Sequence, residues 1–127
     1  MEVLKIRPEQ AEAFGRDAMT DFESRAVAHL RRKLPDLTEG LSDEQLRVRV
    51  KSCVPRAARY DLVTERQIIC FVDTSYLLGE QFDTDPRHAD VAEVLNRKDT
   101  DPDRRAGVIV GMALGRRHLA NRGPGHE

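Results

Sequence analysis

Residues 64–79, TERQIICFVDTSYLLG, predict the central helix of the fold. Thr64 and Gln67 form a capping box, in which each side chain accepts a hydrogen bond from the other residue's backbone N–H. The apolar side chains that follow cover a wide arc, and a helix with so much apolar surface is normally surrounded by others. Gly79 supplies the C-terminal stop. We therefore expect a helix over 65–78 at the centre of an all-α fold.

Two helices are predicted before this one. The first begins at Pro8 and ends before Pro35, which makes it about 26 residues long, with apolar residues recurring every three or four positions. A loop follows, and Ser42 with Gln45 then forms a second capping box. Because Pro55 lacks a backbone N–H, we expect a kink or a break late in this second helix.

Two shorter patterns predict the helices that follow the central one. A fourth helix is expected from about 87 to 97, with inward-facing residues Ala89, Ala92 and Leu95. Asp101 as N-cap and Pro102 at the first helical position open a fifth helix, which runs to about Asn121.

Composition agrees with a helical domain. The chain has 127 residues, of which 39% are hydrophobic, 34% charged and 5% aromatic. This predicts a single compact bundle of about five helices with a long first helix over 1–121, followed by a disordered tail at 122–127. No apolar run is long enough to cross a membrane, and the N-terminus lacks the pattern of a signal peptide. We expect a cytoplasmic protein that does not bind membranes.

The charges nearly cancel, with 21 Lys and Arg against 22 Asp and Glu, but they are segregated along the chain. Residues 25–66 contain ten basic and six acidic residues, whereas residues 80–103 contain eight acidic and three basic residues. Such polarity could steer a charged partner, or it could form two solvated faces of one domain. The second interpretation is the more common.

No residue pattern predicts catalysis, a cofactor or a metal site. Cys53 and Cys70 occupy apolar helical positions outside any CxxC pair, and the four histidines are scattered. The acids near Asp83 and Asp85 suggest a calcium loop, but Pro86 interrupts the spacing, and capping or turn formation explains them better. We expect a protein that is not an enzyme.

Two features point to protein partners. Phe82, in the acidic loop, is either a plug over the core or an exposed anchor for a partner. Gly107, Gly111 and Gly115 recur every four residues in the fifth helix at about 1 kcal/mol each relative to Ala. That cost predicts close approach of another backbone, within the bundle by default or across a homodimer or a partner's groove as the second interpretation.

A second function class is nucleic-acid binding by basic residues. The arginines in question are Arg31, Arg32, Arg47 and Arg49. The net charge of −1, the spread of the basic residues around their helices and the scarcity of aromatic side chains disfavour this class. Arg31 and Arg32 also fit the C-terminal end of a helix dipole. A small nucleic-acid-associated regulator remains the alternative hypothesis.

The stretch from Arg25 to Pro86 resembles a set of small bacterial proteins encoded near type VI secretion or related contractile-injection genes. The matching pieces are Arg25-Ala-Val-Ala-His-Leu-Arg31, Leu34-Pro35, Leu41-Ser-Asp-Glu-Gln-Leu46, Arg56-Ala57 through Tyr60, Thr64-Glu-Arg66 and Leu78-Gly-Glu-Gln-Phe-Asp-Thr-Asp-Pro86. The chain departs from that pattern at Asp61, where relatives have Gly, and at Arg87-His88-Ala89, where they have Pro-Trp.

This resemblance implies an accessory role beside a secreted toxin, effector or spike protein, as an immunity protein or an adaptor. It implies no activity. We expect the partner-binding residues to include Phe82, Asp83 and Asp85 in the acidic loop, and Arg31 and Arg32 at the end of the first helix.

Overall fold

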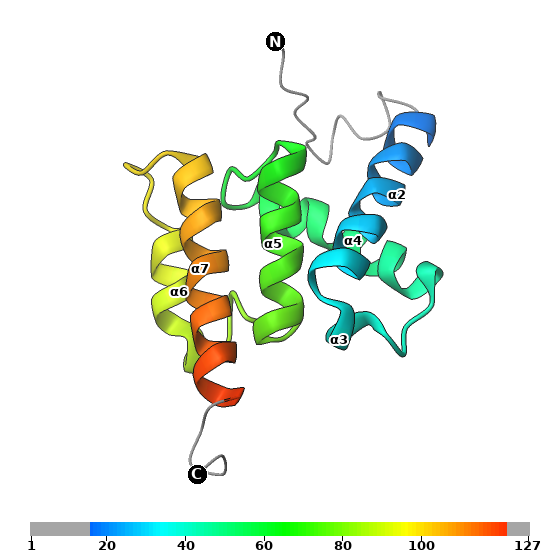
Figure 1. Ribbon diagram of the computed structural model, residues 1–127. Helices are drawn as coiled ribbons and strands as arrows, with labels where there is room; N and C mark the ends of the chain where they lie inside the picture. The colour runs from blue at the N-terminus through cyan, green and yellow to red at the C-terminus, as the bar shows by residue number, and fades with distance from the viewer. Residues whose placement is uncertain (1–15, 122–127) are drawn as a thin grey trace.

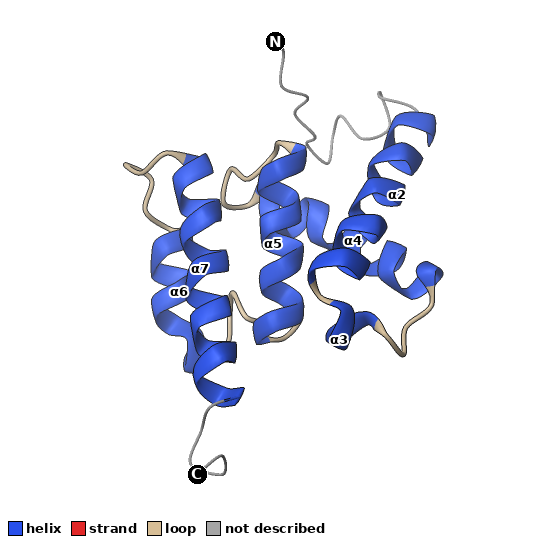
Figure 2. Ribbon diagram, in the orientation of Figure 1, coloured by secondary structure: helices blue, strands red, loops and turns tan. Residues whose placement is uncertain are grey.

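Helix α5 (Glu65–Leu78) lies at the centre of the computed structural model, which describes residues 16–121 (Figure 1). It packs mainly against α7 (Pro102–Asn121) and also against α4 (Asp43–Ala58). The other elements are α2 (Arg16–Lys33), α3 (Pro35–Thr38), the 3₁₀ turn η1 (Pro86–His88) and α6 (Ala89–Leu95). Figure 2 shows no strand in this part of the chain. The predicted all-α fold is confirmed.

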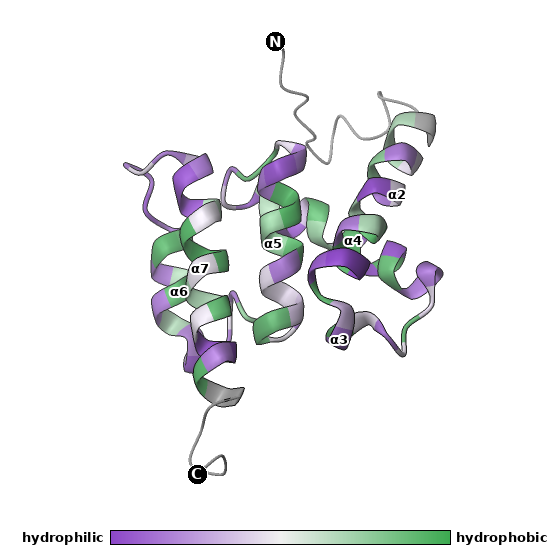
Figure 3. Ribbon diagram, in the orientation of Figure 1, coloured by the Kyte–Doolittle hydropathy of each residue, from purple (hydrophilic) through white to green (hydrophobic). Residues whose placement is uncertain are grey.

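The core forms where α5 meets its neighbours. Phe71 and Ile68 of α5 are buried against Phe22 of α2, Val50 of α4 and Ile109 of α7. Because burial of apolar area is the main favourable term in folding, this shared cluster explains why the most apolar helix is central. Figure 3 shows the apolar colouring of α5 beside more polar ends of the surrounding helices.

Both predicted capping boxes are present. The Ser42 hydroxyl accepts from the N–H of Gln45, and the Gln45 side chain accepts from the N–H of Ser42. Thr64 and Gln67 make the same reciprocal pair at the start of α5. At its other end α5 stops at Gly79, whose φ of 120° is open to glycine but strained for other residues. The predicted bounds of α5 are therefore confirmed.

Two local predictions are corrected. The expected loop after the first helix contains α3, which begins with Pro35 at its first position, where the missing N–H is harmless. Helix α4 continues through Pro55 to Ala58, so the break that was one of two expected outcomes is wrong. Because Pro55 has no N–H, the backbone carbonyl four residues earlier lacks its helical donor; Pro55 is exposed, so water can hydrate that carbonyl.

The inward face of the fourth helix also differs from the prediction. Of the three residues predicted to face inward, Leu95 is buried, Ala92 is half-buried and Ala89 is exposed, and the other buried residues of α6 are Val91 and Val94. Valine buries more apolar area than alanine, and α6 packs against α7. The predicted start of the first helix at Pro8 and the tail at 122–127 lie outside the described residues. Within them, no helix is long and apolar enough to span a membrane.

Candidate functional site

The loop that joins α5 to η1 is fixed to the core by Phe82. Its side chain is fully buried, and its ring centroid lies 4.9 Å from that of Phe71, which in turn stacks on Tyr60 at 6.2 Å. Of the two interpretations of Phe82, the core plug is therefore the one observed. The expectation that Phe82 itself contacts a partner is corrected, because a fully buried ring has no surface to offer.

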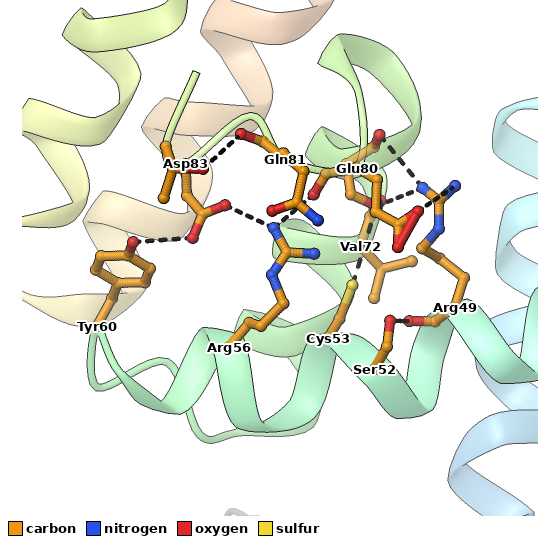
Figure 4. Close-up of polar contacts among 11 residues, drawn as sticks. Arg49, Ser52, Cys53, Arg56, Tyr60, Val72, Glu80, Gln81 and Asp83 are labelled. Carbon is orange, nitrogen blue, oxygen red and sulfur yellow. Dashed lines mark hydrogen bonds and ion pairs between the residues drawn. The ribbon is translucent and has the colours of Figure 1, made fainter. Parts of the chain in front are cut away.

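Asp83 forms a latch between this loop and α4 (Figure 4). One carboxylate oxygen accepts from Arg56 at 2.5 Å, and the other accepts from the Tyr60 hydroxyl at 2.9 Å. The Arg56 guanidinium also donates to the carbonyl of Glu80 and lies 5.3 Å from the centre of the Phe71 ring. Burial, followed by the hydrogen bond to Asp83, raises the pKa of Tyr60 to about 12.

The latch changes the interpretation of Asp83. Only 2% of its side chain is exposed, and both carboxylate oxygens have partners inside the chain. Asp83 was expected to contact a partner, but it is instead part of the scaffold. A buried carboxylate beside a buried guanidinium is costly to desolvate and is kept only with good geometry.

Asp85 has a capping role. Its carboxylate accepts from the backbone N–H of Arg87 and pairs with the Arg87 guanidinium at 2.8 Å, so it caps the turn that begins at Pro86. These hydrogen bonds lower the pKa of Asp85 to about 2. The capping interpretation is confirmed for Asp85 but not for Asp83, which pairs with Arg56 instead. The described residues contain no group of three His, Cys, Asp or Glu that could hold a metal.

Arg31 and Arg32 have different surroundings in the structure. Arg31 donates to the carbonyls of Thr38 and Leu41 and pairs with Asp43 at 2.7 Å, so it holds the α3 turn between α2 and α4. Arg32 is exposed to solvent. The structure therefore leaves Arg32 available for a partner but places Arg31 in the connection between helices.

The arginines of α4 are also engaged within the chain. Arg47 pairs with the buried Glu23 at 3.3 Å. Arg49 stacks on Tyr76 at 4.3 Å from the ring centre and lies 3.8 Å from Glu80. Since phosphate contacts need guanidinium groups that face outward, this arrangement does not favour the nucleic-acid alternative.

The two cysteines are poorly suited to nucleophilic chemistry. Burial raises the pKa of the Cys53 thiol, which lies 4.0 Å from the Ser75 hydroxyl. Burial also raises the pKa of Cys70. Both groups therefore favour the protonated thiol, whereas a nucleophilic cysteine needs its thiolate.

The Nε2 atom of His29 lies 3.0 and 2.9 Å from the two carboxylate oxygens of Asp73, a contact that connects α2 to α5.

The glycines of α7 face outward, which overturns the expectation that they pack within the bundle. Gly107, Gly111 and Gly115 are all exposed, and a Cβ built on Gly111 or Gly115 would meet no atom within 4 Å. Only the guanidinium of Arg66 approaches the corresponding position on Gly107, at 3.6 Å. The helix ridge that these glycines form is open to a neighbour.

Exposed apolar side chains lie on the same helix. Four large apolar residues are exposed among those described, and three of them, Val108, Leu114 and Leu119, are on α7. We call the surface formed by Arg104, Gly107, Val108, Gly111, Leu114, Gly115, His118 and Leu119 the outer face of α7. At its N-terminal end it adjoins an open groove of about 580 Å³, whose lining includes Thr100, Asp101, Arg104 and Val108.

Sequence reasoning missed the buried Arg105. Only 2% of this residue is exposed, and its guanidinium donates to the carbonyls of Tyr60, Leu95 and Thr100. It thereby connects the loop before α5 to the end of α6 and the start of α7. The signal was present: Arg105 lies four residues before the buried Ile109, on the inward side of a helix.

Comparisons with protein-family models, with curated proteins and with solved structures found no match.

Proposed function

We propose that the chain is a protein-binding accessory protein and that the outer face of α7 is its binding surface. The observation that carries this proposal is the make-up of that face, where three glycines and three exposed large apolar residues share one helix. A surface helix normally turns charged and polar residues to solvent. Contiguous apolar exposure bordered by polar groups is typical of interaction sites.

The setting we propose follows from the resemblance of residues 25–86. It is the role of an immunity protein or an adaptor beside a toxin or effector of a bacterial contractile injection system. The proposed surface lies on the continuous helix α7, and a surface that is already ordered loses less conformational entropy on association.

The test is co-purification with the proteins encoded by the genes on either side of the one for this chain, with the affinity tag on each of those proteins in turn. We expect a complex of defined stoichiometry that Leu114→Glu abolishes. Val48→Glu is the matched control, because Val48 is the fourth exposed large apolar residue and lies on α4. Absence of a wild-type complex, or equal behaviour of the two variants, would contradict the proposal.

A further inference from the structure

We propose that the outer face of α7 binds a second copy of this chain, with the two α7 helices antiparallel and crossing at Gly111. The inference rests on the proposed function, since it concerns the same face: an effector that binds the outer face of α7 displaces the second copy. A twofold interface must be complementary to itself, so that a feature on one side of the axis matches a feature on the other. The outer face of α7 meets this requirement in three ways.

The first is a match between large residues and glycines. Gly107 and Gly115 lie four residues before and after Gly111, and Val108 and Leu114 lie three before and after it. At about 100° per residue, Val108 and Gly115 fall on one side of the face, and Leu114 and Gly107 on the other.

In an antiparallel pair that crosses at Gly111, this arrangement brings large side chains of one copy opposite glycines of the other. It sets Val108 of each copy over Gly115 of the other, and Leu114 over Gly107. Each large side chain then meets a residue with no side chain, which lets two helices approach closely. The one side chain beside a glycine, that of Arg66, is 61% exposed and has room to move aside.

The second match joins the groove to Leu119. This side chain is 71% exposed, the most of any large apolar residue described. It lies eight residues after Gly111, about 12 Å along the helix axis at 1.5 Å per residue. The same distance before Gly111 falls between Asp101 and Arg104, where the groove lies. Leu119 of one copy therefore reaches the groove of the other, on the side where Val108 lines it.

The third match is between the helix dipoles. A parallel pair would also set Val108 beside a glycine, but it would align the two dipoles, whereas the antiparallel pair places opposite ends of the two helices together. The charged side chains near the ends of α7 do not add to this preference, because they pair within the chain: Asp103 with Arg66, Arg116 with Asp90 and Arg117 with Asp36.

The first measurement is the mass of the full chain alone by light scattering after size exclusion. One helix pair makes an interface at the small end of specific interfaces, so we expect a dissociation constant of about 1–100 µM. The mass should rise with concentration from the 14.4 kDa of one chain toward twice that value. A mass that stays at 14.4 kDa at concentrations of about 500 µM, well above that range, overturns the inference.

Two variants locate the interface. Leu119→Glu changes an exposed side chain and Gly111→Leu fills space that is empty in the single chain, so both should fold. We expect each to weaken the dimer at least tenfold, whereas Val48→Glu on α4 should leave it unchanged. A dimer that survives both α7 substitutions refutes the assignment to this face. Circular dichroism establishes that each variant is folded.

Disulfide cross-linking then tests the orientation, in a Cys70→Ser background that removes the more accessible native thiol. A mixture of Val108→Cys and Gly115→Cys chains should give a cross-linked heterodimer, because antiparallel pairing sets these positions together. A mixture of Val108→Cys and Gly107→Cys is the control, since only a parallel pair joins them. The reverse result contradicts the antiparallel arrangement.

Failure of this inference is distinguishable from failure of the proposed function. A chain that is monomeric alone, yet loses its effector complex on Leu114→Glu, overturns the homodimer and supports protein binding by the α7 face. A chain that dimerises through α7 but forms no complex with the effector supports the inference and contradicts the accessory role.

Discussion

Breaking the contact between Arg56 and Asp83 should destabilise the fold far more than breaking an ion pair on the surface. Asp83→Ala and Arg56→Ala are each expected to lower the free energy of unfolding by about 3 kcal/mol. The reason is that each substitution leaves the opposite charge without its partner in a site where only 2% of the Asp83 side chain and 13% of the Arg56 side chain are exposed.

The magnitude follows from the contacts. Asp83 accepts one hydrogen bond from a charged donor and one from Tyr60, and hydrogen bonds to charged groups contribute about 1.5–3 kcal/mol each. Removing one member of a buried pair costs about 3–5 kcal/mol. The residual exposure of Arg56 lets water reach its guanidinium, which places the expected loss at the lower end of that range.

A double-mutant cycle separates the pair from the rest of the site. Asp83→Ala with Arg56→Ala removes both charges, so we expect a loss of about 4 kcal/mol instead of about 6, a coupling of about 2 kcal/mol. The control cycle uses Arg97 and Glu93, an i,i+4 pair whose side chains are 54% and 68% exposed, with an expected coupling of about 0.3–0.5 kcal/mol. Urea unfolding followed by circular dichroism gives all the energies. Equal coupling in the two cycles would refute the reasoning.

Three further predictions concern side chains that hold the scaffold. Phe82→Ala should lower the free energy of unfolding by about 3–5 kcal/mol in the same urea assay, because the whole ring is buried; a loss below about 1 kcal/mol would contradict its place in the core. The raised pKa of Tyr60 means that its stabilising effect is complete below pH 10 and disappears as the pH rises to about 12; Tyr60→Phe should remove this part of the pH dependence of the melting temperature, and superimposable wild-type and variant profiles would exclude it. Thr64→Ala should lower the free energy of unfolding by about 1–2 kcal/mol and Ser42→Ala by about 0.5–1 kcal/mol, since Thr64 is buried and Ser42 is exposed; a larger loss for Ser42→Ala would contradict the effect of burial.

Local signals along the chain were sufficient for most helix boundaries. The two capping boxes and Gly79 act within a few residues of themselves, so their hydrogen bonds can be predicted without the rest of the fold. The phase of α6 could not be predicted in this way, because it depends on which side of the helix α7 covers. Arg105 shows the same limit, since its three acceptors come from segments that only the fold brings together.

The segregated charges show how tertiary structure changes the meaning of a sequence pattern. The basic middle of the chain and the acidic loop were interpreted as a steering field or as two solvated faces. In the structure they meet each other, through Arg49 with Glu80, Arg56 with Asp83, Arg66 with Asp103 and Lys98 with Asp61. Opposite charges that pair within the chain produce little long-range field. The charge pattern alone is therefore expected to steer a partner only weakly.

The same comparison explains why α7 is the stronger candidate for a binding surface than the acidic loop. Phe82, Asp83 and Asp85 were predicted to contact a partner, but each has a structural task as plug, latch or cap. A motif whose residues build the scaffold indicates a shared fold before it indicates a shared partner. The glycines of α7 have no such task within the described chain: a Cβ at Gly111 would touch nothing, although alanine there would stabilise the helix by about 1 kcal/mol. Close approach of a neighbouring molecule at Gly111 would explain why glycine stands there despite this cost in helix stability.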